Sequence, residues 1–230
     1  VSAAGWVSSE KLIIASATDL RLFNISTGSS EQICQLENNN FSTRSNDGRA
    51  DPYGGFWIGT MGLDAEPQAG SIYRFFEGEI VQLFPNITIS NSICFSPDKK
   101  FGYFCDTPER QIMRFSLDQN GWPRSDPEVF IDLQETNLNP DGAVVDLSGY
   151  LWSAQWGASR VARYDRDGSF VSEVKFSAKQ ISCPALGGKN MSTLFATSAS
   201  VDLEDANPND GKTFLIEVDC VGQKEHRVRI

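Results

Sequence analysis

Histidine and long apolar runs are scarce in this sequence. The only histidine among the 230 residues is His226, near the C-terminus, so a Ser-His-Asp or Cys-His catalytic arrangement would have to use that one imidazole. No Gly-x-Ser-x-Gly, His-Glu-x-x-His or phosphate-binding loop motif is present. No apolar run approaches the roughly 20 residues of a membrane-spanning helix, and no signal peptide is visible after Val1. We therefore expect neither triad catalysis nor a membrane protein.

Basic residues are outnumbered, and cysteine pairs are lacking. The 20 Lys and Arg against 30 Asp and Glu give a net charge of −10, which argues against a nucleic-acid partner because such binding depends on basic side chains. The five cysteines are odd in number and form no Cys-x-x-Cys pair. This pattern indicates free thiols in a reducing compartment, so we expect a cytoplasmic protein.

Short apolar runs that end in small residues recur about every 45 residues, a period typical of propeller blades. Each run is followed by a segment that alternates apolar with polar residues, as a half-buried strand does. A third strand follows in four units, and His226–Ile230 is the expected equivalent in the fifth. A short strand ahead of each run completes the unit. The five runs are Lys11–Ser16, Phe56–Thr60, Phe101–Asp106, Tyr150–Ala154 and Thr193–Thr197.

This repetition predicts an all-β protein, a β-propeller with about five four-stranded blades forming a single domain over residues 1–230. A β-sandwich also contains many short strands, but it does not predict the same four-strand pattern five times. Almost no helical periodicity is present. We expect most of the 15 Phe, 5 Trp and 5 Tyr to pack between blades.

The first strand of each blade lines the central channel of a propeller. Polar side chains near the starts of these strands should therefore surround one end of the channel. The predicted ring comprises Arg44, Asn46, Asp47, Asn91, Asp141 and Cys183.

Asn91 and Asp141 offer oxygen ligands suited to Ca²⁺, Mg²⁺ or Mn²⁺ and usable by Zn²⁺. Taken alone, each is more often a turn residue bonded to the nearby backbone. Arg44 and Asn46 can bind substrate oxygens, or else bond to the aspartates that follow them in sequence. A channel cation would polarise a substrate carbonyl and lower the pKa of a bound water, which Asp141 would orient or deprotonate. Such a site would hydrolyse esters or lactones without a serine nucleophile.

Several ordered phrases resemble the SMP-30/gluconolactonase/luciferin-regenerating-enzyme family, which includes regucalcin. The resemblance extends almost from end to end of the chain. The matching segments are Arg44–Pro52, Gly55–Met61, Ser90–Asp98, Pro140–Gly142, Trp152–Gly157, Arg160–Val161, Asp167–Gly168, Cys183–Ala185 and Thr197–Ala199.

The resemblance implies a six-bladed propeller that holds one divalent cation, Ca²⁺ or Zn²⁺ or else Mn²⁺ or Mg²⁺, and hydrolyses sugar lactones such as gluconolactone. It implies that Asn91 and Asp141 are metal ligands, with Asp141 also the proton donor and acceptor. Arg44 and Asn46 would contact the substrate. A family acidic substrate residue would fall at Asp64, which has a shorter side chain.

Two departures from the family pattern stand out. The early Leu-Gly-Glu-Gly-Pro segment, which carries a glutamate metal ligand, has no counterpart before Gly5, so residues 1–230 are expected to lack most of the first blade and to bind metal weakly. Ser92 stands where the family commonly has glycine, and its added Cβ and hydroxyl are expected to shift the backbone there.

Three functions remain open on the sequence. The first is a metal-dependent sugar lactone hydrolase, the second a non-catalytic, calcium-binding, regucalcin-like propeller, and the third an interaction scaffold without metal. The sequence does not specify the lactone, the cation or the oligomeric state.

Overall fold

The computed structural model describes residues 1–230 and contains 19 β-strands and two short 3-10 helices, η1 (Thr107–Glu109) and η2 (Gln134–Thr136). The strands form five antiparallel sheets in which neighbours along the chain are neighbours in the sheet. The first three sheets are β1 (Ala3–Trp6), β2 (Lys11–Ala15), β3 (Asp19–Asn24) and β4 (Ser30–Gln35); β5 (Thr43–Ala50), β6 (Phe56–Gly62), β7 (Gly70–Phe76) and β8 (Glu79–Ile87); and β9 (Ser90–Phe95), β10 (Phe101–Asp106), β11 (Gln111–Ser116) and β12 (Glu128–Asp132). The last two are β13 (Asn139–Val145), β14 (Leu151–Trp156), β15 (Arg160–Tyr164) and β16 (Phe170–Lys175); and β17 (Gln180–Gly187), β18 (Thr193–Ala199) and β19 (Thr213–Glu217).

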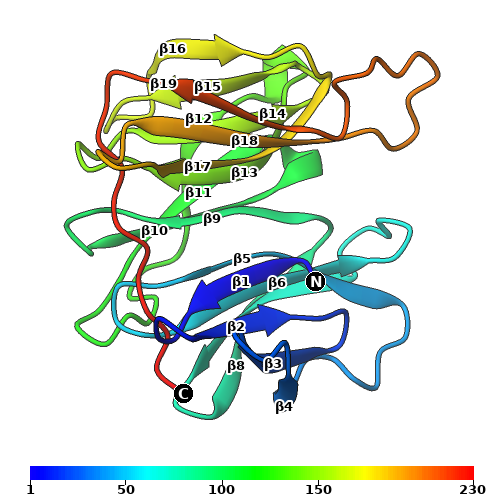
Figure 1. Ribbon diagram of the computed structural model, residues 1–230, viewed down its shortest axis with the longest axis vertical. Helices are drawn as coiled ribbons and strands as arrows, with labels where there is room; N and C mark the ends of the chain where they lie inside the picture. The colour runs from blue at the N-terminus through cyan, green and yellow to red at the C-terminus, as the bar shows by residue number, and fades with distance from the viewer.

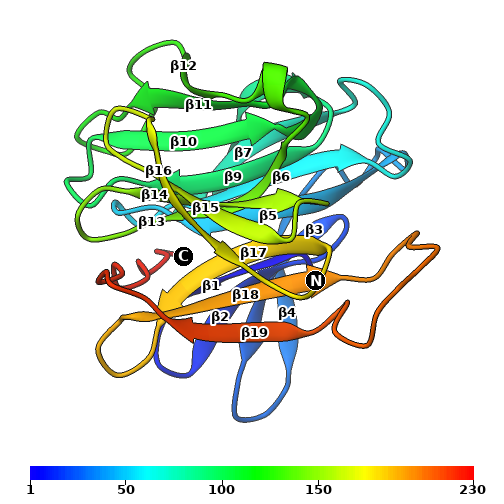
Figure 2. The same cartoon turned by 90° about the horizontal axis from the view of Figure 1, so that it is seen from above.

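The sheets stand side by side as the blades of a β-propeller (Figure 1). Successive blades touch through their first strands, β1 with β5, β5 with β9, β9 with β13 and β13 with β17. The first blade (β1–β4) lies in the lower half of Figure 1 and the last blade (β17–β19) in the upper half, and both lie in the lower half of Figure 2. The prediction of an all-β propeller with five blades is confirmed, whereas the six blades implied by the family resemblance are not observed.

The fifth blade has three strands, so the prediction that His226–Ile230 supplies its fourth strand is wrong. After β19 the chain turns away from its own blade. Val228 N then donates to the carbonyl oxygen of Trp6 in β1 (2.7 Å). The segment Gly222–Arg229, hereafter the C-terminal strap, starts beside the fifth blade, where Gly222 N donates to the carbonyl oxygen of Met191 (2.7 Å), and ends beside the first.

Aromatic side chains fill the space between the second and third blades, as the sequence predicts. Trp57 of β6 stacks on Phe115 of β11 with ring centroids 5.2 Å apart, and Phe84 of β8 stacks on Phe104 of β10 at 4.8 Å. Trp57 and Phe115 are almost fully buried. Such pairs add to the burial of apolar area, so they hold adjacent blades together.

All five cysteines are free, as expected, and Cys94 and Cys105 are buried. Stability therefore depends on blade packing and hydrogen bonding and not on disulfides. None of the helices has the length and apolar character needed to cross a membrane.

Candidate functional site

Arg44 and Asn46 lie near the start of β5, the innermost strand of the second blade. Arg44 Nη1 donates to Asn46 Oδ1 (3.1 Å), and Asn46 Nδ2 donates to Asn91 Oδ1 (3.2 Å). Asp51, one alternative partner considered for Arg44, pairs instead with Arg74 (2.6 Å). Asn46 thus reaches toward the third blade, whereas Arg44 bonds within β5 to Ser45 and Asn46.

Asn91 continues this series of hydrogen bonds into the fourth blade. Its Nδ2 donates to Thr107 Oγ1 (2.9 Å), and Thr107 Oγ1 donates to the carbonyl oxygen of Pro140 (2.8 Å). The series begins at Arg44 and ends at the residue before Asp141. Side chains from β5, β9 and η1 and the backbone of β13 therefore meet at one end of the channel; the sequence predicts this for the three first strands but not for η1.

The backbone at Asp141 is held by a second hydroxyl. Ser92 Oγ donates to the Asp141 carbonyl oxygen (2.6 Å). Ser92 has φ +58°, a left-handed conformation that costs a residue with a Cβ about 1 kcal/mol. Although serine replaces the glycine common in the family, the backbone at position 92 has a conformation that glycine favours. The Ser92 hydroxyl bonds to the backbone of Asp141, the candidate metal ligand.

Two channel carboxyls, Asp47 and Asp141, have raised pKa values. Burial is the largest cause at Asp141 and the nearby Asp47 carboxylate the second; together they raise the pKa of Asp141 to about 8, while the Gly142 N–H lowers it. Burial also raises the pKa of Asp47, opposed by two backbone N–H groups and the charge of Arg49. Because like charges resist simultaneous ionisation, these carboxyls favour a state in which one holds a proton.

Cys183 completes the predicted ring from the fifth blade. Burial, and then the Asp47 carboxylate, raises the pKa of the Cys183 thiol to about 12. A Cβ at Gly142 would lie only 2.8 Å from Cys183 Sγ, so the glycine permits β17 to approach β13 closely. The thiol is protonated at neutral pH, which agrees with a structural role.

Asp64 is the one candidate that the structure leaves apart from the others. It is exposed in the turn after β6, and its backbone N–H donates to Glu66 Oε2 (3.1 Å). Met61 lies opposite Arg44 in the β5–β6 register, so Asp64 is at the same end of the blade as Arg44. No hydrogen bond joins the Asp64 carboxylate to the polar series.

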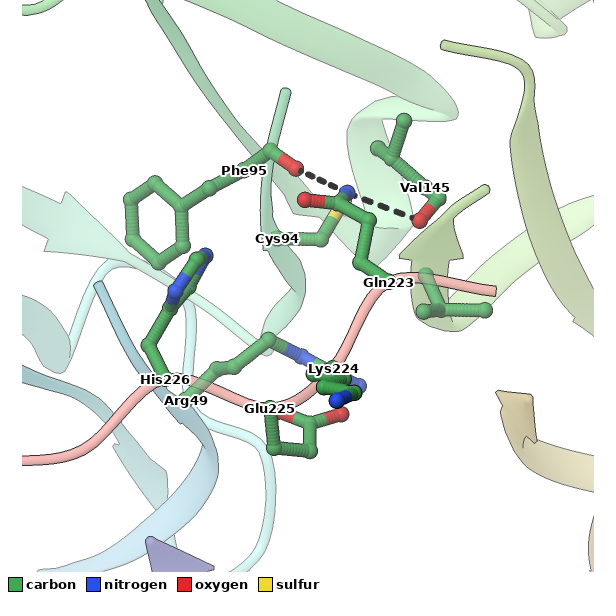
Figure 3. Close-up of a pocket in the computed structure, with 9 residues that line it drawn as sticks. Arg49, Cys94, Phe95, Val145, Gln223, Lys224, Glu225 and His226 are labelled. Atoms are coloured by element: carbon green, nitrogen blue, oxygen red, sulfur yellow. Dashed lines mark hydrogen bonds and ion pairs between the residues drawn. The ribbon is translucent and has the colours of Figure 1, made fainter. Parts of the chain in front are cut away.

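The C-terminal strap passes beside Arg49, Phe95 and Val145, at or near the ends of β5, β9 and β13 (Figure 3). Gln223 Nε2 donates to the carbonyl oxygens of Phe95 (3.0 Å) and Val145 (2.9 Å), the last residues of β9 and β13. Glu225 pairs with Arg49 near the end of β5 (2.6 Å). The strap therefore ties three inner strands together at the end remote from Asn91 and Asp141.

The donors of Asn91 and Asp141 fit a hard divalent cation in kind. An amide oxygen and a carboxylate are preferred ligands of Ca²⁺ and Mg²⁺, and a cation would offset the repulsion between Asp141 and Asp47. These two side chains alone cannot fill the coordination shell of Ca²⁺, which takes about 6–8 oxygens. No cluster of three or more His, Cys, Asp or Glu suited to a metal is present, so water or additional groups would have to complete the shell.

The raised pKa of Asp141 predicts a pH-dependent stability. In the presence of EDTA, the folded protein retains this proton from about pH 4 to about pH 8 while the unfolded chain releases it. Stability from this group is therefore present below about pH 4 and lost as pH rises. We expect Asp141→Asn to gain about 4 kcal/mol relative to wild type between pH 5 and pH 8, measured by urea unfolding. If the free energies of unfolding of wild type and Asp141→Asn change in parallel with pH, the pKa of Asp141 is not raised.

Sequence reasoning did not identify Thr107 as part of the site. It reaches the site from the end of the second strand of its blade, whereas the prediction considered only first strands. The only local signal is its place in Asp106-Thr107-Pro108, a combination that starts a turn. Its two partners lie 16 and 33 residues away, which no local pattern specifies.

Comparison with known proteins identifies the family. The profile described as the SMP-30/gluconolactonase/LRE-like region matches residues 1–200. The chain belongs to this family. A solved structure described as the calcium-binding protein regucalcin from Agrobacterium tumefaciens superposes with a TM-score of 0.97 at 42% identity, over 100% of this chain and 79% of that one.

Two curated members of the family are similar in sequence. A Rhizobium meliloti protein named as a candidate sugar lactone lactonase is 43% identical over 192 residues, 81% of this chain and 65% of that protein. L-arabinolactonase from Azospirillum brasilense is 36% identical over 225 residues, 94% of this chain and 73% of that protein. The chain thus spans just under two thirds of the Rhizobium protein.

Proposed function

We propose that this protein is a metal-dependent hydrolase of sugar lactones. The observation that carries the proposal is the hydrogen-bonded series from Arg44 through Asn46 and Asn91 to the turn of Asp141. In support, the series links the Arg44 guanidinium and the amides of Asn46 and Asn91 to the carbonyl of Pro140, the residue before Asp141, whose carboxyl has a raised pKa. The lactonase names of the relatives described above support the same chemistry.

Each residue has a distinct role in the proposed reaction. Arg44 retains unpaired guanidinium N–H groups, and these would donate to the hydroxyl or carbonyl oxygens of the lactone. Asn46 is held by Arg44 on one side and Asn91 on the other, so it would position Arg44 and contact the sugar. Asp64, at the same end of the blade, would add a carboxylate toward the sugar hydroxyls.

Asn91 and Asp141 would hold the divalent cation, which when bound would act as a Lewis acid toward the lactone carbonyl. Asp141 would accept a proton from the attacking water and return it to the ring oxygen that leaves. The cation would favour the ionised carboxylate of Asp141, which is the form that accepts a proton.

The direct test is lactone ring opening by the purified protein after treatment with EDTA. Gluconolactone and arabinonolactone are offered with added Ca²⁺, Zn²⁺, Mn²⁺ or Mg²⁺, and acid release is followed by a pH indicator. We expect hydrolysis above the spontaneous rate with at least one cation and a return to that rate in EDTA. Because two protein ligands are a small set, we expect weak affinity for the cation. No cation-dependent rate with any lactone would refute the proposal.

A second function, cation binding without catalysis, is supported by the solved structure described as a calcium-binding protein. Calorimetry distinguishes the two functions. Heat from cation binding without turnover of any lactone would favour the second. Neither binding nor turnover would favour an interaction scaffold.

A further inference from the structure

We propose that Thr107 is a positioning residue whose hydroxyl fixes the orientation of the Asn91 amide in the candidate site. This inference deepens the proposed function, because the orientation decides which Asn91 atom is presented as a metal ligand. Thr107 itself would touch neither the cation nor the lactone.

The direction of each hydrogen bond determines the orientation. The Thr107 hydroxyl has one hydrogen, which it donates to the Pro140 carbonyl oxygen (2.8 Å). Toward Asn91 it can therefore only accept, and the atom 2.9 Å away must be Nδ2. Asn91 Oδ1 is then on the other side of the amide, where Asn46 Nδ2 donates to it (3.2 Å).

The backbone around Thr107 is rigidly held, so its hydroxyl is a fixed reference point. Thr107 N donates to the carbonyl oxygen of Ile89 (3.0 Å), just before β9. The carboxylate of the preceding residue, Asp106, accepts from the N–H groups of Thr88 and Ile89, both at 2.8 Å. The start of η1 is thereby tied to the segment that leads into Asn91.

Burial makes the wrong orientation of the amide costly. Asn91 is only 5% exposed, so water cannot replace a lost partner. A flipped amide would place Oδ1 against a hydroxyl that has no hydrogen left to donate, and Nδ2 against the Asn46 donor. Two buried groups would lose their hydrogen bonds. With Thr107 present, a single orientation dominates.

The test compares Thr107→Val with Thr107→Ser. Valine keeps the shape of threonine but removes the hydroxyl, whereas serine keeps the hydroxyl. In EDTA-treated protein labelled with ¹⁵N-asparagine, Asn91→Ala identifies the Asn91 side-chain NH₂ signals. We expect these signals to shift and to exchange with water at least tenfold faster in Thr107→Val, and to change less than twofold in Thr107→Ser. Unchanged signals in Thr107→Val would overturn the inference.

A second measurement reports the consequence for the cation. Calorimetric titration with Mn²⁺ should show about 10–100-fold weaker binding by Thr107→Val, the usual range for the loss of a residue that orients a ligand. Adding Thr107→Val to Asn91→Ala should weaken binding no further. An equal loss in both backgrounds would mean that Thr107 acts independently of Asn91 and would overturn the inference. If the amide signals respond as expected but wild type binds no cation, the positioning role holds and the proposed function fails.

Discussion

We expect Asp141→Ala to lower kcat/KM for lactone hydrolysis by about 10²–10⁴-fold, the range that a general acid-base residue contributes. The variant removes the only carboxyl among the proposed metal ligands of this chain, so cation affinity should fall as well. The Asp47 carboxylate, whose charge helps to raise the pKa of Asp141, would lose this neighbouring carboxyl. The measurements are initial rates of ring opening and calorimetric titration with Ca²⁺ and Mn²⁺.

Asp167→Ala is the matched control for this experiment. Asp167 is an exposed aspartate in the hairpin turn between β15 and β16, far in sequence from every proposed site residue, and its loss should leave rate and cation affinity unchanged. If Asp141→Ala weakens cation binding in a protein that hydrolyses no lactone, the non-catalytic function is favoured. If Asp141→Ala behaves like Asp167→Ala in both measurements, Asp141 has neither role.

The largest effect on stability is expected from Asp51→Asn. The Asp51 and Arg74 side chains are both 0% exposed and form an ion pair at 2.6 Å. Asp51 Oδ2 also accepts from Trp57 Nε1 (3.0 Å), and Oδ1 accepts from the N–H of Tyr53 (2.7 Å). Arg74 Nη1 already lacks a partner, so neutralising Asp51 leaves a buried, uncompensated guanidinium. We expect a loss of about 3–5 kcal/mol in the free energy of unfolding.

The fourth blade supplies a control with the same chemistry. Asp146 accepts from Trp152 Nε1 (3.1 Å) and Arg163 Nη2 (2.9 Å), as Asp51 does from Trp57 and Arg74. The Arg163 side chain is 17% exposed, so water can solvate its charge after Asp146→Asn. Urea unfolding should therefore show a smaller loss for Asp146→Asn than for Asp51→Asn. Equal losses would mean that burial of the arginine is not the cause.

The strand pattern of this protein is determined locally. Alternation of apolar and polar residues and turns such as the one after Ala50 specify strands and hairpins over a few residues. Repetition of that pattern five times was enough to predict the propeller. It also placed Arg44, Asn46, Asn91 and Asp141 on the first strands of blades, because the position of a residue within its own repeat fixes where it lies relative to the axis.

The tertiary structure decided the path of the C-terminal strap and the partners within the site. Within His226–Ile230, Val228 donates to the carbonyl oxygen of Trp6 in β1 and Arg229 to that of Gly54. Gln223, just before this segment, bonds to the last residues of β9 and β13. The contact of Thr107 with Asn91, and that of Ser92 with Asp141, likewise join different strands or different blades. Such contacts depend on distances across the channel, and no short-range sequence pattern contains that information.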